Sequence, residues 1–456
     1  MTRTYASLTV TLGALAVLAA AQAAEFRAGD YGAKGDGRTL DTTAIQSAID
    51  AAAAAGGGTI AFQPGVYLSG SLFLKKGTHL RVDQGVEIRG AQDLSAYPRM
   101  RTRIAGIEMT WPAALINVYE QSNVRISGPG TIDGDGRVWW DSYWRLRKEY
   151  EPRGLRWAAD YDCQRPRLIQ IYKSSKVDLR GLTLKRSGFW TVHICFSRKV
   201  TVDGITIRNN VGGRGPSTDG IDVDSSSDVL VERCDIECND DALCLKAGRD
   251  ADGLRVNRPT ERVVIRDCTV RAGAGGFTIG SETSGGIRNV RVERIHALRP
   301  VPRGIVFKSA KTRGGTVENI VIRGMDFEGV PTPVSINLNW NPSYSYGRLP
   351  EGATDVPDYW RVLTEPVPPE RGLPHFRKVR ISGVRATGAE QAFAVSAYED
   401  APLEDFRFEN VEIEAKTAGR IENARNWRFL NTRIRTADGS RVTLKDCRGV
   451  RGLAQE

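Results

Sequence analysis

Histidine is scarce in this chain, and closely paired cysteines are absent. Only four His occur among 456 residues, and none of the seven cysteines forms a C-x-x-C pair. A structural zinc site is therefore not expected, because such sites use closely spaced Cys and His ligands. The odd number of cysteines leaves at least one unpaired. A bridge between Cys238 and Cys244 is compatible with an oxidising compartment, but spacing alone does not establish it.

Long apolar runs are also lacking, except at the amino terminus. The stretch from Leu8 to Ala20 is too short to span a bilayer, which takes about 20 apolar residues. Arg3 precedes it and Ala21-Gln22-Ala23 follows it, which is the pattern of a secretory signal peptide and its cleavage site. We expect residues 1–24 to be a signal peptide and residues 25–456 to be the mature protein. That protein is expected in the periplasm or outside the cell, with no part in a membrane.

Helix-turn-helix patterns, zinc fingers and long basic runs are missing too, although the chain is basic. Its formal net charge is +10. Such a charge favours an anionic partner, although a protein with a generally basic surface and no such partner has the same net charge. Export fits poorly with nucleic-acid binding, so we expect an acidic polysaccharide as the partner of a monomeric protein.

Helical patterning is nearly absent after residue 60, and a short repeat takes its place. Apolar residues alternate on both sides of one small or polar residue, and successive copies in the middle of the chain start 23 to 34 residues apart. Copies include VDLRGLTL (177–184), VTVDGITI (200–207), VLVERCDI (229–236), VVIRDCTV (263–270), VRVERIHA (290–297) and IVIRGMDF (320–327). Short strands at a nearly constant spacing predict a solenoid. We predict an all-β, single-domain parallel β-helix over a sandwich or propeller, since hairpin turn signals are not periodic.

The ends and the interruptions of the repeat have their own patterns. Residues 40–55 carry the one convincing amphipathic helix, with Asp41 or Thr42 as its N-cap, and we expect it to close the N-terminal end. Insertions at 136–166 and 336–375 are rich in Trp, Tyr, Pro and Arg, and we expect them to form a binding wall. Three cysteines share one repeat position and are expected to stack in the interior: Cys234, Cys268 and Cys447.

Three aspartates are predicted to meet on one surface. Asp219 precedes the pair Asp240-Asp241 by 21 residues, close to one coil, and neighbouring coils lie roughly 4.8 Å apart. Asn239 permits a turn, so both members of the pair can face one cleft. Crowding of like charges raises the pKa of at least one carboxyl group. An acid beside one or two bases is what glycoside hydrolysis requires.

Two other interpretations of acidic residues in this region stay open. Aspartates are common in turns, and that is the role expected of Asp222, Asp224 and Asp228. A cluster of aspartates is also a candidate calcium site, because carboxylate oxygens are the ligands that calcium prefers.

Several runs along the chain match those of one enzyme family, in order. They are 218–222 (TDGID), 239–241 (NDD) with 245–246 (LK), 279–286 (IGSETSGG), 30–37 (DYGAKGDG), 56–75 (GGGTIAFQPGVYLSGSLFLK), 187–193 (SGFWTVH) and 307–315 (FKSAKTRGG). In these runs the chain resembles the polygalacturonases, glycoside hydrolase family 28, over most of its length. The resemblance implies a right-handed parallel β-helix that cleaves pectic backbones with inversion and without a metal or cofactor.

The resemblance also implies roles for single residues. Asp240 corresponds to the general acid, while Asp219 and Asp241 correspond to the pair that positions and activates water. Lys308 matches the lysine of an Arg-x-Lys motif that binds the substrate carboxylate, a charge-assisted contact. Further candidates for substrate binding are Lys246, Arg249, Glu282 and His193, although an ordinary surface position for Lys246 and a strand-end position for His193 stay open.

Two family landmarks that concern specificity are altered, and one further position differs. No histidine lies between residues 194 and 295, so Ala274 or Gly275 stands where the family has Gly-His-Gly. Val306 replaces the arginine of Arg-x-Lys, and Ser217 replaces an asparagine. Family members that cleave rhamnogalacturonan also lack the histidine, so that backbone is an alternative to galacturonan.

Two further classes of function are weighed against hydrolysis. A pectate lyase on the same fold needs calcium and an arginine base, and no such motif is present. A non-catalytic glycan-binding β-helix, such as an adhesin or tailspike domain, gains little from three crowded carboxylates facing an acidic polymer.

Overall fold

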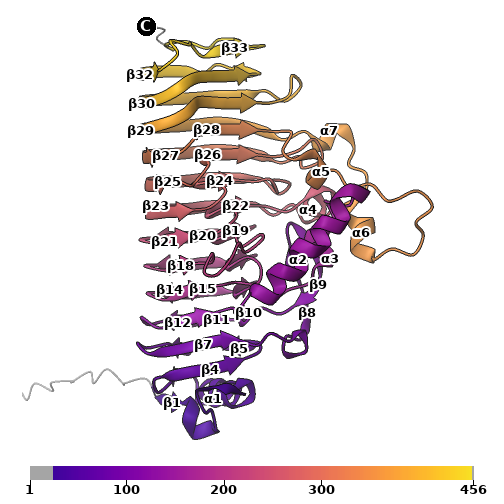
Figure 1. Cartoon of the computed structure of the whole chain (residues 1–456), viewed down its shortest axis with the longest axis vertical. Coiled ribbons are helices and arrows are strands. Elements are labelled where there is room, and N and C mark those ends of the chain that lie inside the picture. Colours follow the sequence, from indigo (N-terminus) through magenta and orange to yellow (C-terminus); the bar gives the residue numbers. More distant parts are fainter. Residues whose placement is uncertain (1–23, 454–456) are drawn as a thin grey trace, which may run out of the picture.

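The short alternating stretches of Val, Ile and Leu form strands that stack into a long parallel β-helix (Figure 1). The computed structural model describes residues 24–453. Residues 1–23 of the expected signal peptide therefore lie outside the described residues. Thirty-one strands belong to one sheet, and the strand pairs between successive coils are parallel. This confirms the predicted fold class. No helix among residues 24–453 has the length and apolarity needed to cross a membrane.

The strands of the N-terminal half are β1 (Glu25–Arg27), β2 (Asp36–Leu40), β3 (Gly58–Ala61), β4 (Gly65–Ser69), β5 (Leu72–Leu74), β6 (Thr78–Arg81), β7 (Val86–Gly90), β10 (Ile116–Tyr119), β11 (Ser122–Ser127), β12 (Thr131–Asp133), β13 (Ile169–Tyr172), β14 (Ser175–Arg180), β15 (Thr183–Lys185), β16 (Val192–Cys195), β17 (Arg198–Asp203) and β18 (Thr206–Arg208). Those of the C-terminal half are β19 (Ile221–Asp224), β20 (Ser227–Glu232), β21 (Asp235–Glu237), β22 (Leu243–Lys246), β23 (Thr260–Ala272), β24 (Phe277–Ile279), β25 (Ile287–Leu298), β26 (Arg303–Lys308), β27 (Thr316–Glu328), β28 (Thr332–Asn337), β29 (His375–Ser396), β30 (Leu403–Glu422), β31 (Ala424–Arg425), β32 (Arg428–Thr436) and β33 (Thr443–Lys445).

The core is one continuous apolar cluster inside the coils. In each strand every second side chain points inward, so Ile194, Val223 and Leu245 of successive coils stack with less than 1% of their surface exposed. Each such side chain stabilises the fold by about 1.5–3 kcal/mol. The cysteine prediction is confirmed for Cys234 and Cys268, which are buried in this core, whereas Cys447 near the C-terminus is only half-buried.

All seven cysteines are free in the described part of the chain. Cys238 and Cys244 are both buried, and their thiols instead contact backbone carbonyl oxygens of Asp240 and Gly280. The bridge considered from the sequence is therefore not formed in this structure.

The predicted capping helix is α1 (Thr42–Ala54), which lies at the N-terminal end of the stack (Figure 1). Its inward face buries Ile45 and Ile49. Asp41 stands at the N-cap position, but its carboxylate accepts hydrogen bonds from the backbone N–H groups of Lys34 and Gly35, at 2.7 and 3.0 Å. It therefore anchors the preceding loop, and it does not cap the helix.

The outward-facing residues of one strand layer form a column that runs along the helix axis. We call it the outward column, and the strand registers join its members in this order: Asn117, Gln170, His193, Asp222, Cys244, Thr278, Val306, Ser335, Ala394 and Arg420. The candidate catalytic residues lie near the middle of this column. Whatever covers the column on either side therefore decides how a polymer can reach the site.

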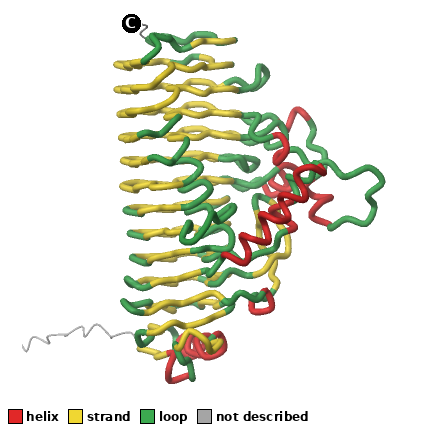
Figure 2. The backbone as a smooth tube through the Cα atoms, in the orientation of Figure 1, coloured by secondary structure: helices red, strands yellow, loops and turns green. Residues whose placement is uncertain are grey.

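Insertions collect over one side of the β-helix, as Figure 2 shows by the helices and loops gathered there. They contain the antiparallel pair β8 (Arg99–Ile104) and β9 (Ile107–Pro112), together with α2 (Arg137–Tyr150), α3 (Ala159–Asp162), α4 (Asp250–Val256), α5 (Pro342–Ser345), α6 (Asp358–Leu363) and α7 (Pro369–Gly372). The described residues also contain three short 3-10 helices: η1 (Ala28–Tyr31), η2 (Leu94–Ala96) and η3 (Glu151–Arg153).

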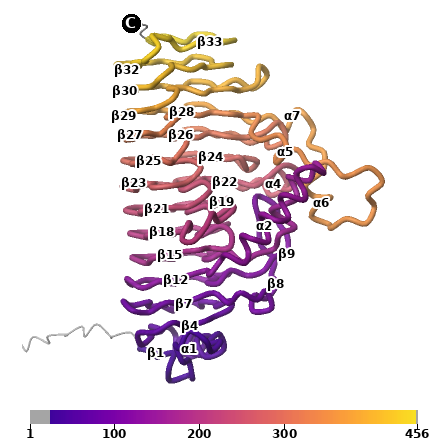
Figure 3. The backbone as a smooth tube through the Cα atoms, viewed as in Figure 1, coloured from indigo at the N-terminus to yellow at the C-terminus, as the bar shows by residue number. Residues whose placement is uncertain are grey.

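The insertions pack on one another through their own apolar cluster. Trp111 of β9, Trp157 beside α3 and Trp360 of α6 are buried together, although they are far apart in the chain. Helices are few after residue 60, as the sequence pattern indicates, and they lie in the insertions, where α2 has 14 residues. In the tube view, the purple α2 and the orange α5–α7 segment approach each other beside the middle coils (Figure 3).

Candidate active site

The insertions and the middle coils enclose a cavity of 230 Å³. Its floor contains all three aspartates predicted from the sequence, Asp219, Asp240 and Asp241. Its walls come from both predicted insertions, through Arg147 and Arg156 on one side and residues 340–344 on the other. The expectation that these insertions wall the site is thus confirmed.

Strand register explains why the three aspartates meet. Ile221 of β19 pairs with Leu243 of β22, so Asp219 and Asp241 precede matching positions on neighbouring coils. Asp240 and Asp241 lie where the chain bends before β22, and the backbone N–H of Asp241 donates to Asp240 Oδ1 at 2.9 Å. One oxygen of each aspartate lies within 4.8 Å of the others.

Two cationic or polar partners hold Asp241 ionised. Lys308 Nζ lies 2.7 Å from Asp241 Oδ2, and Thr278 Oγ1 donates to Asp241 Oδ1 at 3.0 Å. Burial by itself raises the pKa of this carboxyl, but Lys308 and Lys246 lower the pKa below its usual value. Lys308 in turn has its pKa raised to about 12, because Asp241 and Asp240 outweigh its burial.

Asp240 and Asp219 have the opposite electrostatic character. Burial, followed by repulsion from Asp241, raises the pKa of Asp240. Burial, followed by repulsion from Asp222 and Asp240, raises the pKa of Asp219 well above its usual value. The cluster therefore combines a carboxylate with carboxyl groups that retain their protons to higher pH, which is the pairing needed for acid and base catalysis.

Lys246 lies inside the carboxylate cluster, and it is not on the coil surface. Its Nζ is 3.4 Å from Glu282 and 3.6 Å from both Asp219 and Asp222, and it lies 4.9 Å from the centre of the Trp190 ring. The ammonium thus offsets part of the negative charge of the pocket. Lys246 and Trp190 both line the cavity, so the ammonium group is also within reach of a substrate bound there.

The turn role expected of Asp222 and Asp224 is wrong. Both lie in β19 with no exposed surface. Asp228 is not in a turn either, because it lies in β20, where its exposed carboxylate pairs with Arg262 at 2.8 Å. The pKa of Asp222 is raised well above its usual value by burial. Alternation of residues along a strand places Asp222 on the outward column, a signal that was available in the sequence.

Glu282 reaches the cavity, whereas Arg249 does not. Glu282 accepts from Tyr344 Oη at 3.1 Å, and its pKa falls to about 2 because Lys246 and nearby arginines outweigh its burial. Arg249 is fully buried and donates to Tyr161 Oη at 3.0 Å and to the Tyr344 carbonyl at 2.8 Å. Arg249 therefore joins two insertions to the coil behind the pocket. It does not line the cavity, so this geometry gives no support to the predicted direct contact with a substrate.

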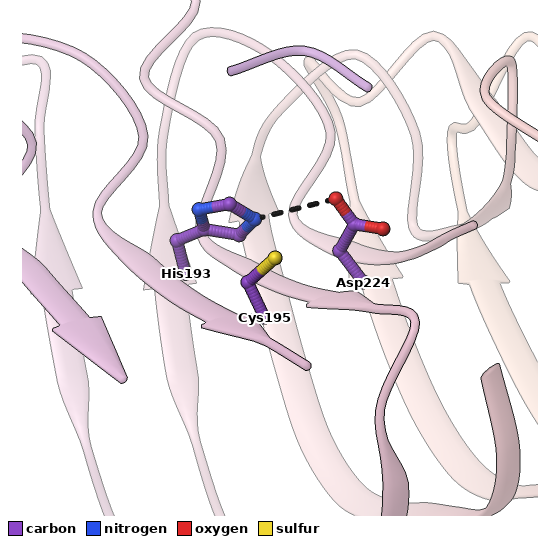
Figure 4. Close-up of side chains that lie close together, drawn as sticks. All are labelled: His193, Cys195 and Asp224. Carbon is purple, nitrogen blue, oxygen red and sulfur yellow. Dashed lines mark ion pairs between the residues drawn. The ribbon is translucent and has the colours of Figure 1, made fainter. Parts of the chain in front are cut away.

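His193 is likewise buried away from the cavity. Figure 4 shows its ring pointing toward Asp224, with Nε2 3.5 Å from the nearer carboxylate oxygen, beside Cys195. Arg167 Nη1 donates to His193 Nδ1 at 2.6 Å, and burial lowers the pKa of His193 to about 4. A neutral histidine held in this way supports the floor of the site, and the geometry does not place it on a substrate.

The family positions that differ in this chain lie around the cavity. Ala274 lines it, and Gly275 is bridged to Asp241 on the neighbouring coil. Val306 is buried on the outward column between Thr278 and Ser335. The side chains at these positions therefore offer neither a hydrogen-bond donor nor a charge to a bound sugar.

Ser217, the third altered position, is held by an insertion. Its hydroxyl donates to Asp160 Oδ1 at 2.7 Å, and Asp160 also binds Arg156 at 2.9 Å. The pKa of Asp160 is well below its usual value, because the two arginines beside it outweigh its burial. The replacement thus links the catalytic coil to the wall formed by α3.

Three groups of His, Cys and acidic residues bring ligand atoms within 4.8 Å of one another in the described part of the chain. The aspartate group already has Lys308 and Lys246 as counter-charges. In the group of Figure 4, Arg103 binds Asp224 at 2.9 Å and Arg167 binds His193, and two guanidinium groups disfavour a cation there. The third group, around His296, lies on the surface.

Comparison with family models gives two matches along the chain. The model described as glycosyl hydrolases family 28 matches residues 64–356, and a model described as rhamnogalacturonase A/epimerase, pectate lyase-like, matches residues 26–85. The first match contains every catalytic and substrate-binding candidate discussed above.

Individual relatives agree with the family model. A "probable polygalacturonase" of Vitis vinifera is 35% identical over 65% of this chain and 59% of its own length. An "exo-poly-alpha-D-galacturonosidase" of Dickeya chrysanthemi is 26% identical over 64% and 53%, so the chain spans between a half and three fifths of these relatives. The crystal structure of a hyperthermoactive exopolygalacturonase from Thermotoga maritima aligns over 92% of both chains, with a TM-score of 0.73 and 27% identity.

Proposed function

The chain belongs to family 28 of the glycosyl hydrolases, and we propose that it is a secreted, inverting hydrolase of galacturonate-containing pectic polysaccharide. The observation that carries this proposal is the juxtaposition of two carboxyl groups with opposite pKa shifts in one cavity. The pKa of Asp240 is raised, and the pKa of Asp241 is lowered by Lys308 and Lys246. We further propose that residues 25–456 act as one catalytic domain and as a monomer, since one apolar core runs through all the coils.

In the proposed reaction Asp240 is the general acid. It donates its proton to the glycosidic oxygen as the bond to the anomeric carbon breaks. Asp241, kept ionised by Lys308, takes a proton from the attacking water, and Asp219 holds that water from the neighbouring coil. Water contributes hydroxide to the anomeric carbon, so the bond is hydrolysed without a metal or cofactor.

Substrate recognition is proposed to rest on cations and aromatic rings in the pocket. Lys308 and Lys246 offer ammonium groups to a uronate carboxylate, and Trp190 and Trp340 offer faces on which a sugar ring can stack. A rhamnogalacturonan backbone is the second candidate substrate. The small apolar side chain of Ala274, which lines the cavity, favours it, because it leaves room for a neutral, methyl-bearing sugar next to a uronate.

The first test is reducing-sugar release from polygalacturonate, rhamnogalacturonan and xylogalacturonan in the presence of EDTA. We expect release from at least one of them, because no step of the proposed reaction uses a metal. The lack of release from every pectic polymer would contradict the proposed hydrolase. Release that requires calcium and produces an unsaturated, ultraviolet-absorbing product would indicate a lyase instead.

The stereochemical outcome is tested by proton NMR of the fresh product. We expect the anomeric configuration to invert, since the carboxylate of Asp241 and the carboxyl group of Asp219, both beside the acid, are available to hold one water. The carboxylate oxygens also lie close enough for attack by a carboxylate itself. Retention of configuration would therefore assign Asp241 or Asp219 as a nucleophile and contradict the water mechanism.

The pH dependence of kcat/KM follows from the pKa directions. The acid must be protonated, so activity falls as pH rises through the raised pKa of Asp240, and the base must be ionised, so activity falls as pH drops through the lowered pKa of Asp241. The acidic and the basic limb of this pH profile report apparent pKa values that belong to the interacting carboxyl groups together. In Lys308→Met we expect the acidic limb to move to higher pH, because the ammonium that stabilises the Asp241 carboxylate is gone; an unmoved limb would contradict this assignment.

Secretion is proposed from the amino-terminal pattern of residues 1–24. Sequencing the amino terminus of the protein recovered outside the cytoplasm of a bacterial host tests it. We expect the mature chain to begin near Glu25, and recovery of an uncleaved chain in the cytoplasm would contradict the proposal.

A further inference from the structure

A polymer can lie on the outward column only where insertions leave it open. On the N-terminal side of the catalytic coil the column is covered. Gln170 and His193 have 1% and 0% of their surface exposed. Arg167 donates to Gln170 Oε1 at 2.8 Å and to Thr102 of β8 at 3.1 Å, and Arg103 of β8 binds Asp224. The β8–β9 hairpin is thus bonded to the column, and it closes the path beyond Asp219.

On the C-terminal side the column is open and its side chains are small. Ser335 and Ala394 follow Val306 on successive coils, and Arg420 follows them. Ser335, Ala394 and Arg420 line a second cavity of 620 Å³ over β28, β29 and β30, which we call the C-terminal groove. Its lining includes Arg303 and Arg420 and contains no acidic residue.

Trp340 connects the C-terminal groove to the catalytic cavity, because it lines both. Lys308 of the catalytic cavity lies 4.8 Å from the centre of its ring, and Arg303 of the groove lies 5.2 Å from it. A row of cations with an aromatic face between them is suited to successive uronate units, since each unit offers one carboxylate and one ring face.

The catalytic cavity has room for little more than a chain end. At 230 Å³ it is smaller than the roughly 300–1,000 Å³ of typical pockets for drug-sized ligands. Its far wall is closed by Arg156, which is bound to Asp160 and lies 5.2 Å from the centre of the Tyr344 ring, so two insertions meet there.

We propose that the enzyme acts on chain ends: the terminal sugar occupies the catalytic cavity, and the adjoining units of an acidic polysaccharide lie in the C-terminal groove, where Arg303 and Arg420 bind their carboxylates. This inference rests on the proposed hydrolase function. The bond that breaks is the one between the cavity and the groove, beside Trp340, and each hydrolytic event uses one water and releases one terminal unit. Arg420 is available for this role because its side chain is 62% exposed and, among residues 24–453, its one ion pair is with Glu422 at 3.3 Å.

The size of the first products tests the mode of action. With the pectic polymer that the enzyme cleaves, we expect monosaccharide alone from the earliest time points by mass spectrometry, with little loss of viscosity. A ladder of oligosaccharides at early times overturns the chain-end proposal but leaves the hydrolase intact. A lack of any product overturns the hydrolase proposal instead, so the two failures are distinguishable.

The groove is tested by Arg420→Ala and Arg303→Ala, compared on a long oligosaccharide and on the disaccharide of the same linkage. We expect kcat/KM to fall about tenfold for the long substrate in each variant, since a hydrogen bond to a charged group is lost. Arg420→Ala should leave the disaccharide unaffected, because that substrate ends next to Trp340. Arg294→Ala is the control, as Arg294 is similarly exposed, at 55%, and lines neither cavity. Equal effects of Arg420→Ala on both substrates, or no effect on either, overturn the assignment of the groove.

Discussion

Replacement of Asp240 by Asn is expected to lower kcat by about 10²–10⁴-fold, because a positioned general acid contributes that much to glycoside cleavage. The amide cannot donate the proton that the leaving oxygen needs. Asp240 is suited to that donation by its raised pKa, which keeps it protonated at higher pH than an ordinary aspartate. The measurement is kcat at saturating polymer, at the pH optimum of the unchanged enzyme.

The control for this variant is Asp228→Asn, which removes an exposed carboxylate of β20 that pairs with Arg262 and lines neither the catalytic cavity nor the C-terminal groove. We expect its kcat to be unchanged. KM of Asp240→Asn should change far less than kcat, since the acid acts in the transition state. If Asp240→Asn kept more than about a tenth of the activity, a different residue would have to be the acid.

Replacement of Arg103 by Met is expected to destabilise the fold by about 3–5 kcal/mol, since it leaves the carboxylate of Asp224 buried without its cationic partner. Arg103 and Asp224 are 2.9 Å apart, and neither side chain has any exposed surface. Methionine fills a similar volume, so the effect reports mainly the lost charge. The measurement is the midpoint of denaturant unfolding, together with Tm.

The matched double variant, Arg103→Met with Asp224→Leu, separates charge from packing. We expect it to recover much of the lost stability, because neither charge remains buried alone. Equal destabilisation in the single and the double variant would show that shape, and not the ion pair, holds the hairpin in place. The pKa of Asp224 is far below its usual value, because Arg103 and His193 outweigh its burial. The pair therefore stabilises the fold above the unfolded-state pKa of about 4 and loses this effect only as pH falls toward the folded-state pKa.

Much of the site was predictable because it follows from local periodicity. The repeat places Asp219 one coil before Asp241, and alternation along the strands separates inward from outward side chains. The same alternation places Asp222 and Asp224 on the outer face with Lys246, so the turn role expected of them was avoidable. Lys308 and Glu282 were found only through the family resemblance, since their spacing from the aspartates carries no signal of its own.

The roles of His193 and Arg249 were not predictable, because burial depends on what covers them. His193 follows a motif of the family and lies on the correct column, yet it is covered by Arg167 and the β8–β9 hairpin. Arg249 follows the aspartate pair closely in sequence, but Tyr161 and Tyr344 hold it behind the cavity. Each of these partners is more than 20 residues away along the chain.

The sequence by itself determined the β-helix and the meeting of Asp219, Asp240 and Asp241, because both depend on a coil length repeated along the chain. Only the tertiary structure decided that the outward column is closed on one side of these aspartates and open on the other. That asymmetry comes from contacts between insertions and coils, such as Arg103 with Asp224, that no local pattern encodes.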